Sequence, residues 1–159
     1  ILDPKPIGLI NWDEREDNDD YGKSFIAPDA NILIVDDNAM SLRVFEELLK
    51  KTEIHIKKAN SGKTALQIAN EQKFDIIFMD HMMPEIDGIE AMRIIRTQND
   101  GMNKETPIIV LTANDALGTR DYYVQEGFTD YVSKPIYPKV LEDMILQYLP
   151  EEKCIFKNK

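Results

Sequence analysis

The sequence predicts a doubly wound α/β domain whose five parallel strands follow the order 2-1-3-4-5. From Asn31 onward, short apolar runs alternate with amphipathic stretches, which is typical of a repeated strand–helix unit. Runs such as Ile32–Val35 and Ile108–Leu111 are apolar at consecutive positions. Strands of a parallel sheet are covered by helices on both faces, so their sequences lack the alternation of half-exposed strands. These two observations together predict the fold class.

Each expected strand is a short apolar run bounded by polar or turn residues. The five predicted strands are Ile32–Val35, Glu53–Ala59, Phe74–Met79, Pro107–Thr112 and Phe128–Val132. Helices are predicted where apolar residues recur three and four positions apart. These stretches are Met40–Leu49, Ala65–Ala69, Ile89–Ile95, Leu117–Val124 and Val140–Tyr148. Pro138 suits the first turn of the last helix, and Pro150 marks its end.

Composition restricts the classes of protein to consider. The 159 residues are 43% hydrophobic and 30% charged, which is typical of a globular protein that can bury a core. No apolar run approaches the ~20 residues that cross a bilayer, so we expect no direct membrane contact. A net charge of −10 argues against direct binding of a nucleic-acid backbone. The single cysteine, Cys154, favours a cytoplasmic location.

The first part of the chain differs from the rest. Residues 1–30 contain eight acidic and three basic residues, and the run 13–20 shows no apolar period. We therefore expect an acidic linker over 1–30, the α/β domain over 31–149 and a C-terminal tail over 150–159. The chain begins with isoleucine and carries no signal-peptide pattern, so we expect it to be a segment of a longer protein.

Polar residues follow four of the five predicted strands at one edge of the sheet. Asp36 and Asp37 follow the first strand, Asp80 the third and Lys134 the fifth, while Thr112 ends the fourth. In an open α/β sheet, ligands bind beyond the carboxyl ends of the strands. Three carboxylates placed together raise one another's pKa unless a cation lies between them. Oxygen ligands without histidine or cysteine favour Mg²⁺, or Mn²⁺.

Side-chain length at these positions agrees with the expected strand order. The fifth strand lies two spacings from the third, about 10 Å, which only a long side chain such as Lys134 can span. Thr112, one spacing away, needs only its short hydroxyl group. The alternative is that strand-end aspartates act as helix caps or turn residues and that the lysine is a solvated loop cation. His81 directly follows Asp80, and successive side chains of a strand point to opposite sides. We therefore expect His81 to point away from the carboxylates and to have a structural or exposed role.

Four segments resemble the response-regulator receiver domain. They are Ile32–Asn38, Met79–Gly88, Leu111–Ala113 and Tyr131–Pro135, in order and at matching spacing. The resemblance implies a flavodoxin-like receiver fold and a function in two-component phosphorelay signal transduction. The preceding segment, Phe25–Ala30, is similar to the join before the receiver of a hybrid sensor histidine kinase. This narrower similarity implies a histidine kinase as the parent protein, anchored in the cell membrane.

The resemblance also implies roles for individual residues. Asp80 would be the phosphoacceptor, which attacks the phosphorus atom of a phosphohistidine. Asp37, Asp80 and the backbone carbonyl of Met82 would bind Mg²⁺, and Asp36 would act mainly through metal-bound water. Met82 and Asn114 occupy positions that modulate hydrolysis of the aspartyl phosphate. Methionine cannot hydrogen-bond an attacking water whereas asparagine can, which leaves the lifetime of the phosphoryl group open.

Other residues would hold the phosphoryl group and report its presence. Lys134 would pair with one phosphoryl oxygen, and the Thr112 hydroxyl would donate to another. The peptide bond between Lys134 and Pro135 is expected to be cis. On phosphorylation Thr112 would turn toward the phosphoryl group and Tyr131 would move inward. The surface of the fourth helix, fifth strand and fifth helix would then change.

The implied partner is a histidine kinase or a histidine phosphotransfer domain, and a homodimer would use the surface of the fourth helix, fifth strand and fifth helix. The chain itself would be a phosphoacceptor that catalyses its own phosphoryl transfer and dephosphorylation. One rival function is an aspartate-nucleophile phosphatase of the haloacid dehalogenase type. That family expects a second aspartate two residues after the nucleophile, where this chain has Met82. Another rival is a pseudo-receiver that binds partners without phosphorylation.

Overall fold

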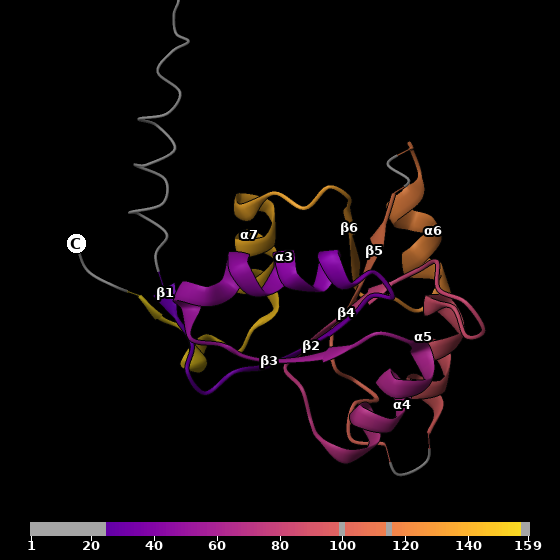
Figure 1. Ribbon diagram of the computed structural model, residues 1–159, viewed down its shortest axis with the longest axis horizontal. Helices are drawn as coiled ribbons and strands as arrows, with labels where there is room; N and C mark the ends of the chain where they lie inside the picture. The colour runs from indigo at the N-terminus through magenta and orange to yellow at the C-terminus, as the bar shows by residue number, and fades with distance from the viewer. Residues whose placement is uncertain (1–24, 99–100, 114–115, 157–159) are drawn as a thin grey trace, which may run out of the picture.

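A five-stranded parallel sheet is the centre of the computed structural model, which describes residues 25–98, 101–113 and 116–156 (Figure 1). The strands are β2 (Asn31–Val35), β3 (His55–Ala59), β4 (Ile76–Asp80), β5 (Ile108–Thr112) and β6 (Asp130–Ser133). They pair in parallel in the order β3-β2-β4-β5-β6. Counted from β2 as the first strand, this is the predicted order 2-1-3-4-5, so the predicted fold class is confirmed.

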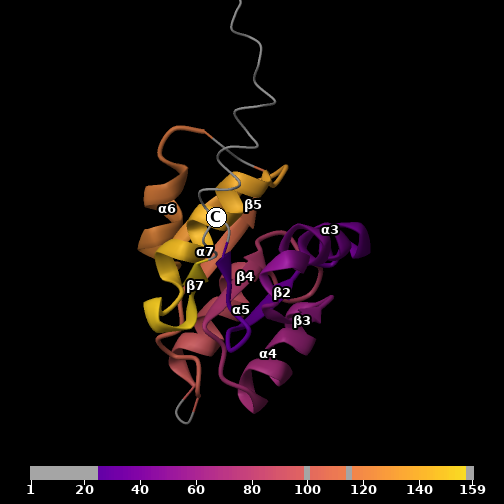
Figure 2. The same ribbon diagram turned by 90° about the vertical axis from the view of Figure 1, so that its left-hand side faces the viewer.

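Helices cover both faces of the sheet (Figure 1 and Figure 2). They are α3 (Ala39–Leu49), α4 (Gly62–Glu71), α5 (Gly88–Thr97), α6 (Thr119–Glu126) and α7 (Pro138–Tyr148). Helices α3 and α7 pack in one apolar cluster with the sheet, and α4, α5 and α6 pack in the other. Among the described residues, no helix has both the length and the apolar character needed to span a bilayer.

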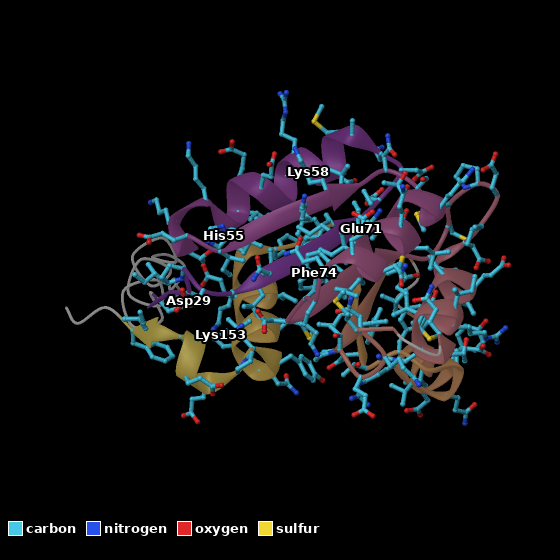
Figure 3. The ribbon with its side chains drawn as sticks, turned by 90° about the horizontal axis from the view of Figure 1, so that it is seen from below. Asp29, His55, Lys58, Glu71, Phe74 and Lys153 are labelled. Carbon is cyan, nitrogen blue, oxygen red and sulfur yellow. The ribbon has the colours of Figure 1, made fainter. Side chains whose placement is uncertain are left out.

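The two-layer covering explains why the central strands are apolar throughout. Every residue of β4 and of β5 is buried, as expected for strands with helices on both sides. The edge strand β3 is different, because His55, Lys57 and Lys58 are exposed. Figure 3 labels His55 and Lys58 on this edge strand. Lysine on an edge strand discourages pairing with another chain.

A second sheet of two short strands joins the ends of the described chain. Strand β1 (Phe25–Ile26) pairs antiparallel with β7 (Ile155–Phe156), which follows a 3-10 helix at Glu151–Lys153. The Phe25 side chain is only 4% exposed and belongs to the core cluster that contains α3 and α7. Lys153, labelled in Figure 3, forms an ion pair of 3.0 Å with Asp75 just before β4.

These contacts alter the expected domain boundaries. Residues 25–30 fall in the predicted linker and residues 150–156 in the predicted tail, yet both segments pack on the domain. Strands of two residues carry no periodic pattern, so no pattern in the sequence predicted them. The remainder of the predicted linker, residues 1–24, and of the tail, residues 157–159, lies outside the described residues.

The β1–β7 pair leads to a prediction about stability. We expect Phe25→Ala to lower the free energy of unfolding by about 3 kcal/mol, because it removes a large apolar side chain from a packed cluster. Phe156, whose ring centroid lies 6.3 Å from that of Phe25, is 54% exposed and is the matched control. Phe156→Ala should cost less than about 1 kcal/mol. Urea denaturation measures both, and equal losses would show that Phe25 is not part of the core.

Candidate functional site

Three aspartates meet at the carboxyl ends of neighbouring strands. Asp80 is the last residue of β4, and Asp36 and Asp37 directly follow β2. One carboxylate oxygen from each lies within 4.8 Å of the others. Asp36 is fully buried and Asp80 is 6% exposed, whereas Asp37 is exposed. The structure therefore brings together the three carboxylates that the strand-end pattern predicted.

Strand register and a helix cap place the carboxylates. Val35 of β2 is paired with Met79 of β4, so the residues that follow, Asp36 and Asp80, reach the edge of the sheet side by side. The backbone N–H of Asn38 donates to Asp36 Oδ1 at 3.0 Å. The Asn38 side chain accepts from the N–H groups of the first turn of α3, which caps that helix. The turn between β2 and α3 is thus held by both residues.

The chain after Asp80 returns closely onto the site. The backbone N–H of Gly88 donates to the His81 carbonyl at 2.8 Å, which closes the loop before α5. A Cβ atom at Gly88 would lie 2.3 Å from the Asp80 carbonyl oxygen, so only glycine fits there. Asp87 caps α5 by accepting from the Glu90 N–H. Met82 lies in the same loop, two residues after Asp80, and is 73% exposed.

Lys134 supplies the cation that the sequence analysis expected at this edge. Its Nζ lies 2.9 Å from Asp36 Oδ2 and 3.3 Å from Asp80 Oδ1. Lys134 follows β6, and β5 lies between β6 and β4 in the sheet. The full length of the lysine side chain is therefore needed to reach the acids. The peptide bond to Pro135 is cis, as expected. Three carboxylates against one ammonium group leave the site with a negative charge.

Burial and charge perturb the titration of both central groups. Burial and the charge of Asp36 raise the pKa of Asp80 from 3.8 to about 6, although the Lys134 ammonium opposes the change. Burial alone would lower the pKa of Lys134. The hydrogen bond to Asp36 and the charges of Asp80 and Asp36 outweigh burial, and the pKa of Lys134 rises. At neutral pH the lysine is charged and Asp80 is mostly a carboxylate.

The raised pKa of Asp80 predicts a pH-dependent stability in buffer free of divalent cations. A carboxyl group whose pKa is higher in the folded state stabilises the fold fully below pH 3.8, and this contribution is lost as the pH rises through about 6. Asp80→Asn removes the buried charge. We expect the variant to be about 2 kcal/mol more stable than the native chain at pH 8. Denaturant titrations at pH 8 and pH 4.5 measure the difference, which must shrink at the lower pH.

Thr112 lies on β5, next to the strand that ends in Asp80, and Tyr131 lies on β6, one strand further along the sheet. Thr112 ends β5 and is 6% exposed. Its hydroxyl accepts a hydrogen bond of 3.2 Å from the Tyr123 hydroxyl. Tyr131 lies on β6 and is partly buried against the cluster that contains α4, α5 and α6. Asn114, the second residue expected to modulate hydrolysis, lies outside the described residues.

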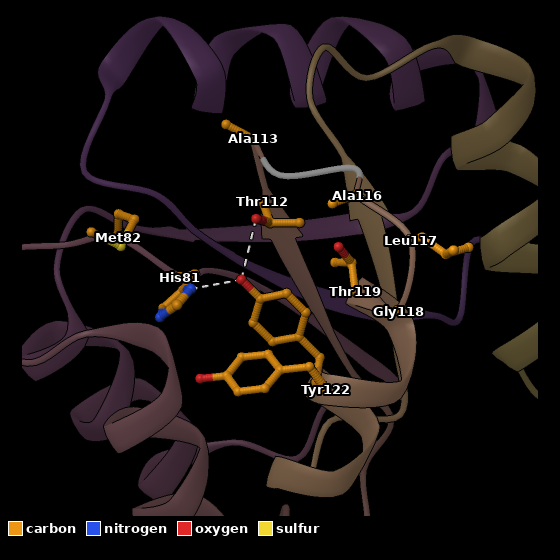
Figure 4. A pocket seen from close by; sticks show the side chains of 10 residues that line it. His81, Met82, Thr112, Ala113, Ala116, Leu117, Gly118, Thr119 and Tyr122 are labelled. Carbon is orange, nitrogen blue, oxygen red and sulfur yellow. Dashed lines mark hydrogen bonds between the residues drawn. The ribbon is translucent and has the colours of Figure 1, made fainter.

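Tyr123 was not among the site residues predicted from the sequence, and His81 was expected to have a structural or exposed role. Tyr123 Oη lies 2.7 Å from His81 Nδ1, so His81 connects through this tyrosine to Thr112. Figure 4 shows His81 and Thr112 joined by dashed lines to the same tyrosine hydroxyl. In the sequence Tyr123 is one more apolar residue at helical spacing. Nothing in that spacing shows where its hydroxyl group lies.

Two hollows flank the carboxylates. One, of about 470 Å³, is lined by His81, Met82, Thr112 and residues at the start of α6 (Figure 4). The other, of about 460 Å³, lies between α3 and the loop after β6, with Lys134 in its wall. The arrangement combines a buried carboxylate, a cluster of carboxylate oxygens that could hold a cation, an ammonium group paired with two of the acids, and access from solvent. Such a site can bind a tetrahedral anion at a carboxylate.

Comparison with known proteins agrees with this chemistry. Residues 32–146 match the response regulator receiver domain family. The chain is 34% identical over 119 residues to the signal transduction histidine-protein kinase BarA of Escherichia coli (strain K12), which covers 75% of this chain and 13% of BarA. The chain therefore spans a small part of the curated relatives that it matches.

Solved structures share the fold. The receiver domain of sensor histidine kinase PA1611 from Pseudomonas aeruginosa PAO1, with a magnesium ion in its active-site cleft, has a TM-score of 0.67 and 34% identity over 75% of this chain and 96% of that one. A chain in the co-crystal structure of Saccharomyces cerevisiae histidine phosphotransfer protein Ypd1 and the Ssk1 receiver domain has a TM-score of 0.71 and 28% identity. That match covers 84% of this chain and 97% of the other. The BeF3-activated DrrB receiver domain has a TM-score of 0.64 and 27% identity, over 75% and 96% respectively.

Proposed function

This chain belongs to the response regulator receiver domain family and is a receiver domain of two-component phosphorelay signalling, and we propose that Asp80 is its phosphoacceptor. The observation that carries the proposal is the meeting of three carboxylates and the Lys134 ammonium at one edge of the sheet. Asp80 is the acid that lies in the strand itself and that contacts the lysine at 3.3 Å. Its carboxylate is thus held where the incoming group can be neutralised.

The proposed reaction is transfer of a phosphoryl group from a phosphohistidine. An Asp80 oxygen attacks phosphorus, the O–P bond forms, and the N–P bond to the imidazole breaks, with its electron pair returning to the ring nitrogen. The transition state is rich in charge, so positioning and neutralisation provide most of the catalysis. Lys134 pairs with one phosphoryl oxygen, and the Thr112 hydroxyl donates to another.

The donor set fits a hard divalent cation. The three charged donors are the carboxylates of Asp36, Asp37 and Asp80. The positive charge of Lys134 offsets only one of them, so the site keeps a net negative charge. Asp37, Asp80 and the Met82 carbonyl would hold Mg²⁺, or Mn²⁺, with Asp36 acting through bound water. When bound, the cation neutralises charge on the phosphoryl oxygens. The PA1611 receiver, which contains magnesium in its cleft, supports this assignment.

The proposed partner is a histidine kinase or a histidine phosphotransfer domain. An apolar surface flanks the site and includes Met40 and Val44 of α3 and Tyr137 and Val140 near the start of α7, all more than 40% exposed. A helix that carries the phosphohistidine could pack on this surface with its imidazole above Asp80. The complex of Ypd1 with the Ssk1 receiver supports a partner of this kind.

The proposed output is a change in the surface formed by α6, β6 and α7. Thr112 turns toward the phosphoryl group and Tyr131 follows it inward, which biases this surface toward its active form. The same surface would serve a homodimer. Met82 and Asn114 are proposed to set the rate of hydrolysis. We also propose that the parent protein is a hybrid histidine kinase, with this receiver domain on the cytoplasmic side of the membrane.

Phosphoryl transfer tests the proposal directly. The chain is mixed with Mg²⁺ and a histidine phosphotransfer domain that carries a ³²P-labelled phosphohistidine. We expect the label to move to this chain as a phosphoryl group sensitive to hydroxylamine, the behaviour of an acyl phosphate. A chain that binds the donor without taking label would instead be a pseudo-receiver, and steady release of phosphate from simple monoesters would indicate a phosphatase.

A further inference from the structure

Tyr123 presents a buried hydroxyl group beside the phosphoacceptor strand. The residue lies on α6 and is 3% exposed. Its ring makes edge contacts with His81 and Phe128, at centroid distances of 5.4 Å and 5.7 Å. The ring is therefore held on two sides, and its hydroxyl points to a fixed place. None of the chemistry described above uses that hydroxyl.

The Tyr123 hydroxyl bridges two residues of the site. It lies 2.7 Å from His81 Nδ1 and donates to Thr112 Oγ1 at 3.2 Å. His81 follows the phosphoacceptor directly in the chain, and Thr112 is the residue assigned to a phosphoryl oxygen. A chain of hydrogen bonds thus links the loop after β4, helix α6 and the end of β5.

We propose that Tyr123, held by His81, is a positioning residue that retains the Thr112 hydroxyl in its resting orientation and competes with the phosphoryl group for it. The inference rests on the proposed function, because it assigns Thr112 to the phosphoryl oxygen. Thr112 must turn to reach that oxygen, and the turn breaks the contact with Tyr123. The resting contact therefore stabilises the unphosphorylated form relative to the phosphorylated form.

His81 makes this competition reversible. A buried hydroxyl left without a partner carries a desolvation cost. When Thr112 turns away, the Tyr123 hydroxyl keeps its contact of 2.7 Å with the imidazole, so it is not left unpaired. The cost of switching is then about that of one ordinary hydrogen bond.

The competition predicts the direction in which removal of the Tyr123 hydroxyl changes the affinity for a phosphoryl analogue. Tyr123→Phe removes the hydroxyl and keeps the ring that packs against His81 and Phe128. With its competitor gone, Thr112 should bind a phosphoryl analogue about fivefold more tightly, the factor that corresponds to one hydrogen bond of about 1 kcal/mol. A hydroxyl that instead polarised Thr112 toward the phosphoryl group would give weaker binding in the same variant.

The experiment measures beryllofluoride binding by isothermal titration calorimetry at saturating Mg²⁺. Beryllofluoride is the phosphoryl analogue because it activates the DrrB receiver. Tyr122→Phe is the matched control, since Tyr122 lines the same hollow on the same helix, is 48% exposed and contacts Tyr123 through its ring. We expect a fivefold gain for Tyr123→Phe, no change for Tyr122→Phe and unchanged Mg²⁺ affinity in both.

A second comparison separates competition from a general effect on structure. In a Thr112→Val background the Tyr123→Phe change should have no effect on beryllofluoride binding, because the group under competition is absent. His81→Phe keeps an aromatic ring at the contact and removes only the tether. It should weaken beryllofluoride binding relative to the native chain, because the Tyr123 hydroxyl would lose its remaining partner when Thr112 turns away, and it supplies the test if Tyr123→Phe does not fold.

The results distinguish failure of this inference from failure of the proposed function. If the native chain binds beryllofluoride and Tyr123→Phe binds it equally or more weakly, the competition is overturned while Asp80 keeps its role. A gain that persists in the Thr112→Val background would also overturn it. If the native chain and Asp80→Asn both fail to bind, the proposed function fails and this inference fails with it.

Discussion

Asp80→Asn is expected to reduce phosphoryl labelling of this chain to background. The change removes the oxygen nucleophile and keeps the size of the side chain, so the rest of the site remains in place. The label should disappear with either donor, a phosphorylated histidine phosphotransfer domain or a small phosphodonor such as acetyl phosphate. Measurement of ³²P incorporation after acid and hydroxylamine treatment gives the result.

The control for this experiment is another aspartate. Asp143 lies on α7, and its side chain is 52% exposed and paired only loosely with Lys139, at 3.5 Å. Asp143→Asn should label like the native chain. Asp80→Asn is expected to be more stable than the native chain in metal-free buffer at pH 8, and its denaturation curve separates loss of label from loss of folding. Full labelling of Asp80→Asn would assign the phosphoacceptor to another residue.

Asp37→Ala is expected to remove most of the thermal stabilisation that Mg²⁺ gives the native chain. A ligand at about 100 times its Kd stabilises a folded protein by about 2.7 kcal/mol, which corresponds to roughly 5 to 10 °C for a domain of this size. Asp37 is the exposed member of the three carboxylates and lies where a cation would enter. Without it the remaining ligands bind the cation weakly. Differential scanning calorimetry with and without Mg²⁺ measures the shift.

Asp37→Ala is also expected to change the melting temperature in metal-free buffer. Removing Asp37 relieves repulsion among the three carboxylates, so the melting temperature should rise slightly, by less than the Mg²⁺ shift of the native chain. Asp143→Asn is again the control and should keep the full Mg²⁺ shift. Equal Mg²⁺ shifts in Asp37→Ala and the native chain would exclude Asp37 as a ligand.

Much of the site could be predicted because its residues lie at the carboxyl ends of the strands. In a parallel sheet every strand ends at the same edge, so the residues after the apolar runs must lie near one another. Asp36, Asp37 and Asp80 were located by this rule, and Lys134 by the length of its side chain. Their observed distances follow from strand register, which the structure shows and which brings Asp36 and Asp80 side by side.

The structure was needed for features that depend on contacts between distant residues with no periodic signal. The β1–β7 pair consists of strands of two residues that lie at opposite ends of the described chain. The position of Gly88 against the Asp80 carbonyl is likewise a matter of tertiary packing.

The sheet, its helices and the residue types at its edge could be predicted from the sequence alone. These depend on apolar periodicity and on the residue type at each strand end, and both can be read along the chain. The position of the Tyr123 hydroxyl between His81 and Thr112 becomes apparent only in the folded protein. A buried tyrosine has the same helical spacing whether or not its hydroxyl meets a partner, and that meeting depends on how α6 packs against β5.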